Sequence, residues 1–171
     1  MARNAKPNNR TTLRFISPDD SSIGLTEDEF KDGWAAYNDT LDERSLKLKP
    51  DETPSYYFLK CLTLDAQQRL VSAISAEEGD ERSVFERCFA PETVGEMRYF
   101  LDKHLVGCAN HQEIVDIHPD GSFTSKSFAW APGEPRPEGL VDSVLADQVL
   151  TFNLFMFCSA ASRLTEKEKK L

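Results

Sequence analysis

The strongest constraint on the fold of this chain is an apolar run that passes into a charged C-terminal tail without an intervening proline or glycine. The apolar run extends from Leu140 to Cys158, and the charged tail extends from Ser162 to Leu171. Because proline and glycine are the usual helix breakers, this pattern predicts one long helix. Its first turns would be apolar and its last turns solvated, which suits an element that docks on another surface.

Length and charge limit the classes of protein to which the chain can belong. A chain of 171 residues with 40% hydrophobic residues can bury a core without disulfides or a metal. The formal net charge of −9 argues against nucleic acid as the main partner, because an acidic surface repels phosphate groups. We therefore predict a globular protein whose main partner is not nucleic acid.

The first ten residues are polar and show no hydrophobic period. We predict a flexible basic arm over residues 1–10 and a single α+β domain over residues 11–171. The basic residues at this end of the chain are Arg3, Lys6, Arg10 and Arg14. Such a cluster is either a solvated tail or a contact for nucleic acid or for an acidic protein surface.

The first third of the chain predicts two strands and one helix. Residues 11–16 form a short predicted strand, and the aromatic-rich residues 55–62 predict an inner strand of the sheet. Thr26 and Glu29 form a capping box in front of an amphipathic helix. The apolar stripe of this helix consists of Phe30, Trp34, Tyr37 and Leu41. This stripe is either part of the core or a face that binds a partner.

Three helices are predicted in the middle of the chain. Thr63 would cap a helix over 64–75, and the apolar positions of residues 84–89 predict a second helix. Pro91 would be the first residue of a third helix. Gly107 would end that helix in a left-handed conformation.

A hairpin is predicted after these helices. Residues 113–117 and 122–128 flank His118–Gly121, in which the positions of proline and glycine predict a type I turn. Together the elements predict an α+β fold: a small, mostly antiparallel sheet packed with about five helices, including a long C-terminal helix.

Motifs of catalysis are absent from the sequence. We find no phosphate-binding loop, dinucleotide fingerprint, zinc-protease motif or serine-hydrolase elbow, and we predict no enzymatic activity and no cofactor. An acidic run of four carboxylates, Glu77, Glu78, Asp80 and Glu81, is interpreted as a solvated turn. No apolar stretch reaches the ~20 residues needed to span a bilayer, so we expect no membrane segment.

Cysteine and histidine residues support a competing hypothesis. The cysteines that lie in apolar segments, and that we interpret as reduced core residues, are Cys61, Cys88 and Cys158. Cys108 lies in a predicted loop between His104 and His111, with His118 beyond. Although their spacing matches no standard zinc module, these side chains could hold a metal or form a Cys/His nucleophilic pair. The alternative function is therefore a small cytoplasmic metal-binding regulator or enzyme centred on His104, Cys108 and His111.

The order of segments from residue 50 onward carries a family resemblance. A strand leads through Leu62 and Thr63 into a helix, a later helix closes within Phe100–Asn110, and a hairpin, an apolar helix and the charged tail follow. This order resembles that of small accessory proteins of bacteriophage structural modules, a group that includes tail assembly chaperones and minor virion proteins.

The resemblance implies a non-enzymatic protein that binds other phage structural proteins, as an oligomer or as part of a larger assembly. It implies a location in the host cytoplasm during assembly or in the virion. The candidate contact residues are Arg3, Lys6, Arg10, Trp34, Tyr37, Trp130, Phe152 and Phe155. Each aromatic residue among them could equally belong to the core. A third alternative is a bacterial adaptor protein with a regulatory partner.

Overall fold

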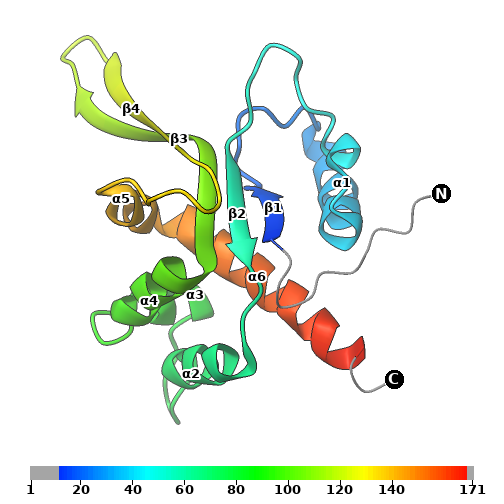
Figure 1. Ribbon diagram of the computed structural model, residues 1–171, viewed down its shortest axis with the longest axis vertical. Coiled ribbons are helices and arrows are strands. Elements are labelled where there is room, and N and C mark those ends of the chain that lie inside the picture. Colours follow the sequence, from blue (N-terminus) through cyan, green and yellow to red (C-terminus); the bar gives the residue numbers. More distant parts are fainter. Residues whose placement is uncertain (1–11, 169–171) are drawn as a thin grey trace. The chain divides into compact units, whose positions relative to one another are not determined.

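The computed structural model describes residues 12–168, with side chains described as far as Ser162. Over these residues four strands and six α-helices are present (Figure 1), which confirms the predicted α+β class. The strands are β1 (Thr12–Ile16), β2 (Tyr56–Lys60), β3 (Leu105–Ile117) and β4 (Phe123–Trp130). They form one antiparallel sheet in the order β1-β2-β3-β4, so β2 is an inner strand as predicted.

The helices of the described chain follow the predicted order. They are α1 (Glu27–Thr40), α2 (Leu64–Ile74), α3 (Val84–Cys88), α4 (Val94–His104), α5 (Leu140–Ala146) and α6 (Gln148–Glu168). A short 3-10 helix, η1 (Glu43–Leu46), follows α1. The predicted arm over residues 1–10, with Arg3, Lys6 and Arg10, lies outside the described residues, whereas Arg14 lies in β1 and forms an ion pair with Glu43.

Internal contacts divide the chain into two compact units. The strand unit comprises Arg14–Phe58 and Val106–Leu140. The helical unit comprises Leu59–Leu105 and Val141–Leu171, with the residues up to Leu13, as far as these residues are described. The prediction of a single domain over residues 11–171 stays a prediction.

Aromatic side chains of α1 and β1 build the core of the strand unit. The predicted capping box is present at Thr26 and Glu29, and α1 begins directly after Thr26. Tyr37 is buried, and its hydroxyl oxygen accepts a hydrogen bond of 3.0 Å from the backbone N–H of Ile16. Burial raises the pKa of Tyr37 to about 12. The ring of Phe15 lies 6.5 Å from that of Tyr37, so this part of the stripe belongs to the core.

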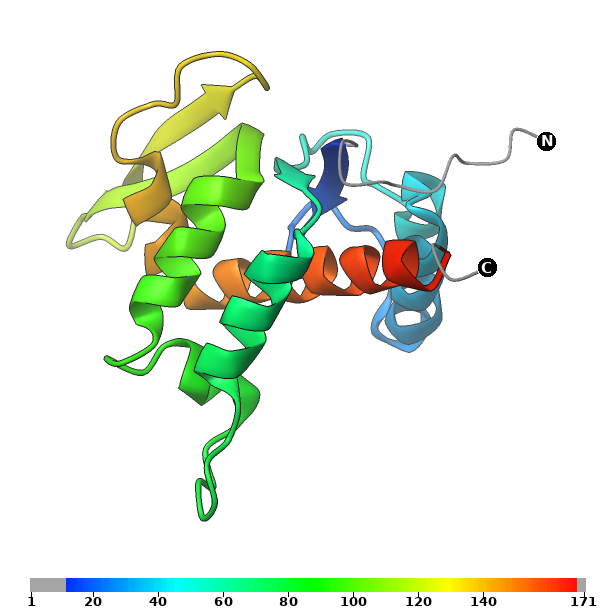
Figure 2. The ribbon, with the colours of Figure 1, turned by 60° about the horizontal axis from the view of Figure 1, so that its bottom comes forward.

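The core of the helical unit lies among α2, α4 and α6. Figure 2 shows α2 and α4 side by side across α6. Leu70, Phe100 and Leu154, one from each helix, are completely buried. The ring of Phe100 packs edge-to-face on Phe155, with ring centres 5.5 Å apart. These contacts bury one side of each of the three helices.

The prediction of one continuous helix from Leu140 onward is wrong. The helix is interrupted at Asp147, and the axes of α5 and α6 form an angle of 98°. The Asp147 carboxylate accepts a 3.0 Å hydrogen bond from the N–H of Leu150, and its carbonyl accepts the N–H of Thr151 at 2.9 Å. Asp147 thus starts a new helix. The long C-terminal helix itself is confirmed, since α6 has 21 residues.

Among the described helices, none is by itself long and apolar enough to cross a membrane. Within residues 12–168, one bent pair, α5 with the apolar part of α6, meets the criterion of length and composition.

Two predicted helix boundaries are also corrected. Gly107 does not end a helix, because α4 ends at His104 and Gly107 lies within β3. A Cβ atom at Gly107 would lie 2.8 Å from the Trp130 carbonyl oxygen, so this glycine is required by close packing instead of a left-handed turn. Pro91 precedes α4 in a turn in which the Ala90 carbonyl accepts the N–H groups of Thr93 and Val94.

Candidate functional site

The outer half of the β3–β4 hairpin is the most exposed structured part of the strand unit. His111 and Phe128 face each other across the hairpin and are buried. Beyond this pair every residue of 112–127 is exposed except the half-buried Glu113. Figure 1 shows this part of the hairpin extending away from β2 and α1 of the same unit. An extended, exposed hairpin is a surface on which another molecule can dock.

Strand register determines which side chains share a face of the hairpin. Ile117 lies opposite Phe123, and Ile114 lies opposite Ser125. Residues directly opposite in antiparallel strands point to the same side of the sheet. Along β4 the side chains alternate, so Phe123 and Ser125 point to one side and Phe128 points to the other. Ile114, Ile117 and Phe123 therefore lie on the side opposite to the buried ring of Phe128.

This outward side carries large apolar side chains with no cover in the described chain. The exposed fraction is 71% for Ile117, 60% for Phe123, 56% for Ile114 and 55% for Val115, which lies at the bulge between Ile114 and Asp116. We call these four residues the hairpin patch. Single exposed apolar residues are ordinary, but a contiguous group of a few hundred Å² marks an interaction site.

Local hydrogen bonds hold the hairpin in shape. At the turn, Asp120 accepts the backbone N–H of Ser122 at 2.9 Å, and hydrogen bonds from Ser122 lower the pKa of the Asp120 carboxyl. Gly121 has the positive φ of 85° that the turn requires. Nearer the core, the Gln112 side chain donates to the Ser127 hydroxyl at 3.0 Å. The patch is thus presented by an ordered element.

One acidic side chain, that of Asp120, is exposed at the turn next to the hairpin patch. Asp116 is 67% exposed, but it lies opposite Thr124, so its side chain is on the face of Phe128. The single lysine of the hairpin, Lys126, lies opposite Glu113 on the same face as Phe128. A surface that covers the patch and the turn will therefore meet the Asp120 carboxylate at its edge.

The predicted aromatic contact residues make contacts within the chain itself. Tyr37 and Phe155 are buried, with 1% and 3% of their surface exposed. Trp130 is 9% exposed, and its indole N–H donates to the Glu134 carbonyl at 2.8 Å. For these three residues the contacts favour the core alternative. Arg3, Lys6 and Arg10 lie outside the described residues, so the predicted role of the arm stays a prediction.

Trp34 and Phe152 are only partly buried. The Trp34 ring stacks on Phe30 with ring centres 5.9 Å apart, and Phe152 packs edge-to-face on Phe85 at 5.3 Å. Both rings thus have a partner within their own unit. Their role in binding stays a prediction.

The histidine and cysteine residues of the competing hypothesis have separate partners. His104 Nδ1–H donates to the Lys60 carbonyl at 3.2 Å, and burial lowers the pKa of His104. His111 Nδ1 lies 2.8 Å from the Tyr57 hydroxyl, and exposed His118 Nε2 lies 2.9 Å from the Thr124 hydroxyl. Among residues 12–162, no group of three or more His, Cys, Asp and Glu side chains could hold a metal.

Cys108 does not lie in the predicted loop. It is a buried residue of β3, its thiol faces the Phe128 carbonyl at 3.9 Å, and burial raises its pKa to about 11. Because the thiolate is the reactive form, this environment keeps the thiol inert at neutral pH. The structure therefore does not assemble the predicted Cys/His site.

Sequence reasoning missed the hairpin patch for an identifiable reason. Ile114 and Ile117 are three residues apart, an odd spacing that puts them on opposite faces of a regular strand. The β-bulge at Val115 inserts one extra residue and brings both onto the same face. The only available signal was the concentration of apolar residues next to the predicted turn.

Comparisons with protein-family models, with curated proteins and with solved structures find no match for this chain.

Proposed function

We propose that this protein is a non-enzymatic binding protein whose hairpin patch docks on an apolar surface of another protein. The observation that supports the proposal is the grouping of four large apolar side chains, each more than half exposed, on one ordered hairpin. Covering them removes apolar surface from water, worth roughly 25 cal/mol per Å² before the costs of association. Phe123 is the expected anchor, because aromatic residues dominate interface energies.

Charge narrows the class of partner. Asp120, at the turn, disfavours an anionic membrane and a second copy of the same patch, because like charges would meet at close range. It favours an apolar partner surface edged by lysine or arginine. The net charge of −9 adds to the repulsion between copies.

The resemblance of the segment order to phage accessory proteins suggests which partner this is. We propose that the patch binds another structural protein of a phage particle, during assembly or within the virion. A binding role of this kind requires no catalysis, and the absence of enzymatic activity stays a prediction.

The test is light scattering with size-exclusion chromatography on the full chain co-expressed with the proteins encoded next to it. The double variant Ile117→Thr/Phe123→Thr removes the patch and keeps residues that favour strands. Leu64→Thr/Val149→Thr is the matched control, because these helix residues are 50% and 51% exposed and lie outside the patch.

We expect a complex with one neighbouring protein that the control retains and the hairpin variant loses. A complex that survives in the hairpin variant, or a failure to form any complex, would overturn the proposal. A homo-oligomer lost in the hairpin variant would instead identify a second copy as the partner, and vesicle binding would identify a membrane. Either result contradicts the binding of another protein.

A further inference from the structure

A groove lies within the helical unit between α2, the start of α3 and α6. Its volume is about 330 Å³, at the lower end of the range of ligand sites. Its floor is formed by Leu62, Leu70 and Phe155, which also belong to the buried core. Its walls include three apolar side chains that remain exposed: Val71 (49%), Val84 (40%) and Met156 (46%). We call this site the α2–α6 groove.

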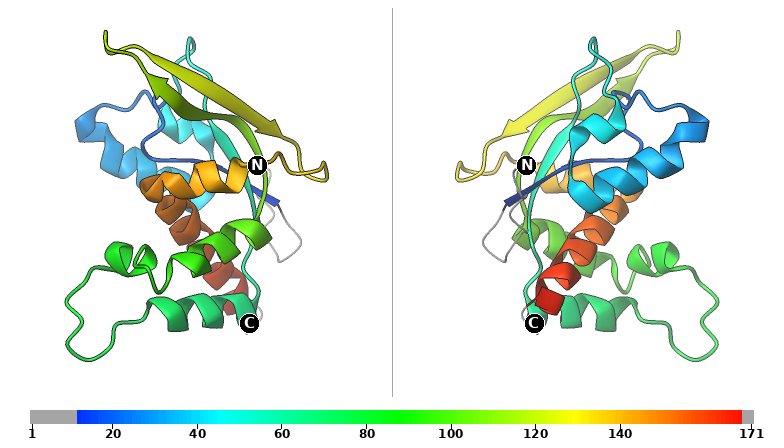
Figure 3. Two further views of the ribbon diagram at one scale, coloured as in Figure 1. Left: turned by 90° about the vertical axis from the view of Figure 1, so that its left-hand side faces the viewer. Right: turned by 90° about the vertical axis from the view of Figure 1, so that its right-hand side faces the viewer.

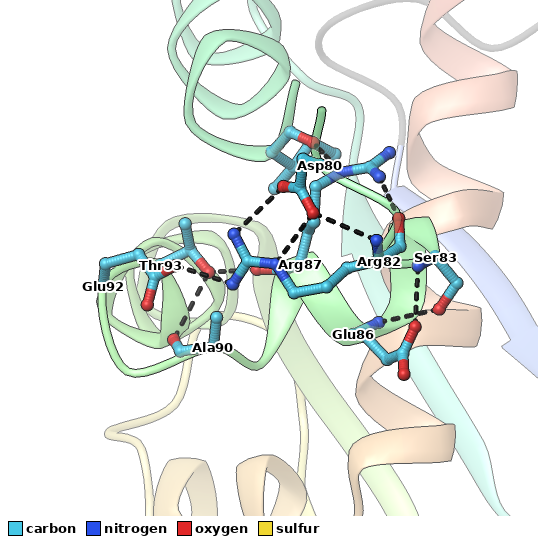
Figure 4. A network of polar contacts seen from close by, with 9 residues as sticks. Asp80, Arg82, Ser83, Glu86, Arg87, Ala90, Glu92 and Thr93 are labelled. Carbon is cyan, nitrogen blue, oxygen red and sulfur yellow. Dashed lines mark hydrogen bonds and ion pairs between the residues drawn. The ribbon is translucent and has the colours of Figure 1, made fainter. Parts of the chain in front are cut away.

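One end of the groove is held open by a polar network. Arg87 lines the groove, and its Nε–H donates to the carbonyl of Ile74, at the end of α2, over 2.8 Å. Its guanidinium also donates to the Arg82 carbonyl (Figure 4). Arg82 in turn forms ion pairs with Asp80 at 3.0 Å and Glu92 at 2.7 Å. The positive charge of Arg87 is thus directed at backbone oxygens of the loop.

The network gives the groove its shape before any ligand binds. Ser83 caps α3 by accepting the N–H of Glu86 at 3.2 Å, and the Thr93 hydroxyl donates to the Arg87 carbonyl. The hydrogen bonds and ion pair from Arg82 lower the pKa of the Asp80 carboxyl, so Asp80 stays charged at neutral pH. A site that is already formed avoids part of the ordering cost of binding.

The loop between α2 and α3 carries negative charge and joins two residues that line the groove. Figure 3 shows residues 75–83 as a wide loop that joins the two helices. Ser75 and Val84 at its ends line the groove, and Glu77, Glu78 and Glu81 between them are exposed. Among residues 12–162 these three glutamates form no ion pair, unlike Asp80 and Glu92. They are available to cations on a bound molecule.

We propose that the α2–α6 groove binds an amphipathic helix of a partner protein, with its apolar face in the groove and its basic residues against Glu77, Glu78 and Glu81. The walls of the groove are side chains of helices whose backbone groups are bonded internally, so an extended peptide would find no strand edge to pair with. A helix satisfies its own backbone and needs only apolar contacts spaced at i, i+3 and i+4. This inference does not depend on the hairpin patch.

Charge also disfavours two other occupants. The three glutamates would repel the headgroup of a fatty acid or anionic lipid and a second copy of this acidic chain. Arg87, the cation of the lining, already donates to the carbonyls of Ile74 and Arg82. A helix with lysine or arginine at one end gains attraction from the three glutamates. Met156 suits such a site, because its flexible side chain adapts to the shape of a partner.

The test is selection of binders to the full chain from a displayed library of helical peptides with a fixed apolar stripe and randomised flanking residues. We expect the selected peptides to carry lysine or arginine at one end and to lose at least tenfold in affinity on Val71→Ser/Met156→Ser. Glu77→Gln/Glu78→Gln/Glu81→Gln should weaken binding and reduce its dependence on salt. Both sets of substitutions are at exposed positions, so circular dichroism should show an unchanged fold.

Three results would overturn the inference: no peptide selected, selected peptides without basic residues, or binding unaffected by Val71→Ser/Met156→Ser. A fatty acid that binds the groove and competes with the selected peptides would identify a lipid site instead and would also overturn the inference. Ile117→Thr/Phe123→Thr is the matched control and should leave peptide binding unchanged. Failure of the hairpin proposal would therefore leave this result intact.

Discussion

The hairpin patch and the α2–α6 groove both expose apolar side chains, but they are built in opposite ways. The hairpin patch lies on two strands beyond the last buried pair, His111 and Phe128, and contributes nothing to a core. The groove shares its floor with the core of the helical unit through Leu70 and Phe155. All residues of the hairpin patch can therefore be substituted with little loss of stability. In the groove this is true only of the exposed wall residues, because the floor residues belong to the core.

Folding constrains the residues of the two candidate sites to different degrees. Apolar residues in the floor of the groove are explained by folding alone. Large apolar residues in the hairpin patch are not, because polar side chains there would fold equally well and expose less apolar surface. The hairpin patch is for that reason the stronger evidence for a binding function. For the groove, the acidic loop between α2 and α3 is the feature that indicates a partner.

Truncation of one phenylalanine in each region should give the largest difference. Phe155→Ala leaves a cavity against Phe100 and should lower the free energy of unfolding by about 3–5 kcal/mol. Phe123→Ala should change it by less than about 0.5 kcal/mol, since the ring is 60% exposed. Urea unfolding followed by circular dichroism measures both. A loss above 2 kcal/mol in Phe123→Ala would mean that the hairpin patch is buried in the folded protein.

A pair of glycines gives the next largest contrast. Gly107→Ala in the strand unit forces a Cβ to within 2.8 Å of the Trp130 carbonyl and 3.0 Å of Pro132, and should cost about 1–3 kcal/mol. Gly95→Ala in α4 has no neighbour within 4 Å and should stabilise the protein by up to about 1 kcal/mol. Thermal unfolding of the two variants should shift in opposite directions. Equal shifts would contradict the packing reason given for Gly107.

Local signals in the sequence predicted elements well where a short motif determines the backbone. The capping box at Thr26 and Glu29 and the turn ending in Gly121 are both present. The break at Asp147 was missed because an aspartate within an apolar run looks like a solvated helix position until its neighbours are placed. Only the structure shows its carboxylate on the N–H of Leu150.

The candidate sites were harder to predict than the elements. The hairpin patch depends on a bulge at Val115, which the residue pattern does not encode. The groove depends on Val71, Val84 and Met156 coming together from three helices, a relation set by tertiary packing. The acidic run was seen in the sequence, but its position beside an apolar groove was not. The sequence therefore shows which acidic and apolar residues are present, but only tertiary packing determines which of them form a common surface.

Substitution of two aspartates that accept backbone N–H hydrogen bonds should lower the free energy of unfolding by different, smaller amounts. Asp147→Ala removes the cap of α6, which is part of the core, and should cost about 1 kcal/mol. Asp120→Ala removes a similar bond at the exposed hairpin turn, where water can replace it, and should cost less than about 0.5 kcal/mol. Urea unfolding measures both. A larger cost at Asp120 would show that the hairpin turn contributes to global stability.

The smallest expected effect is the loss of unfolding free energy at low pH that is caused by His104 in the helical unit. Burial lowers the pKa of His104 below 6.5, but hydrogen bonds to the backbone at Lys60 and Cys61 oppose this change. Because the unfolded chain then binds more protons, the stability contributed by neutral His104 is fully present above pH 6.5 and is lost as the pH falls through the lowered pKa. His104→Asn keeps a donor for the Lys60 carbonyl and cannot titrate in this range. The unfolding free energy of this variant should therefore fall less than that of the parent between pH 7 and 5, although its value at pH 7 is lower. Equal slopes in the two proteins would mean that the pKa of His104 is the same in the folded and unfolded chains, and the loss at low pH would then come from the carboxylates.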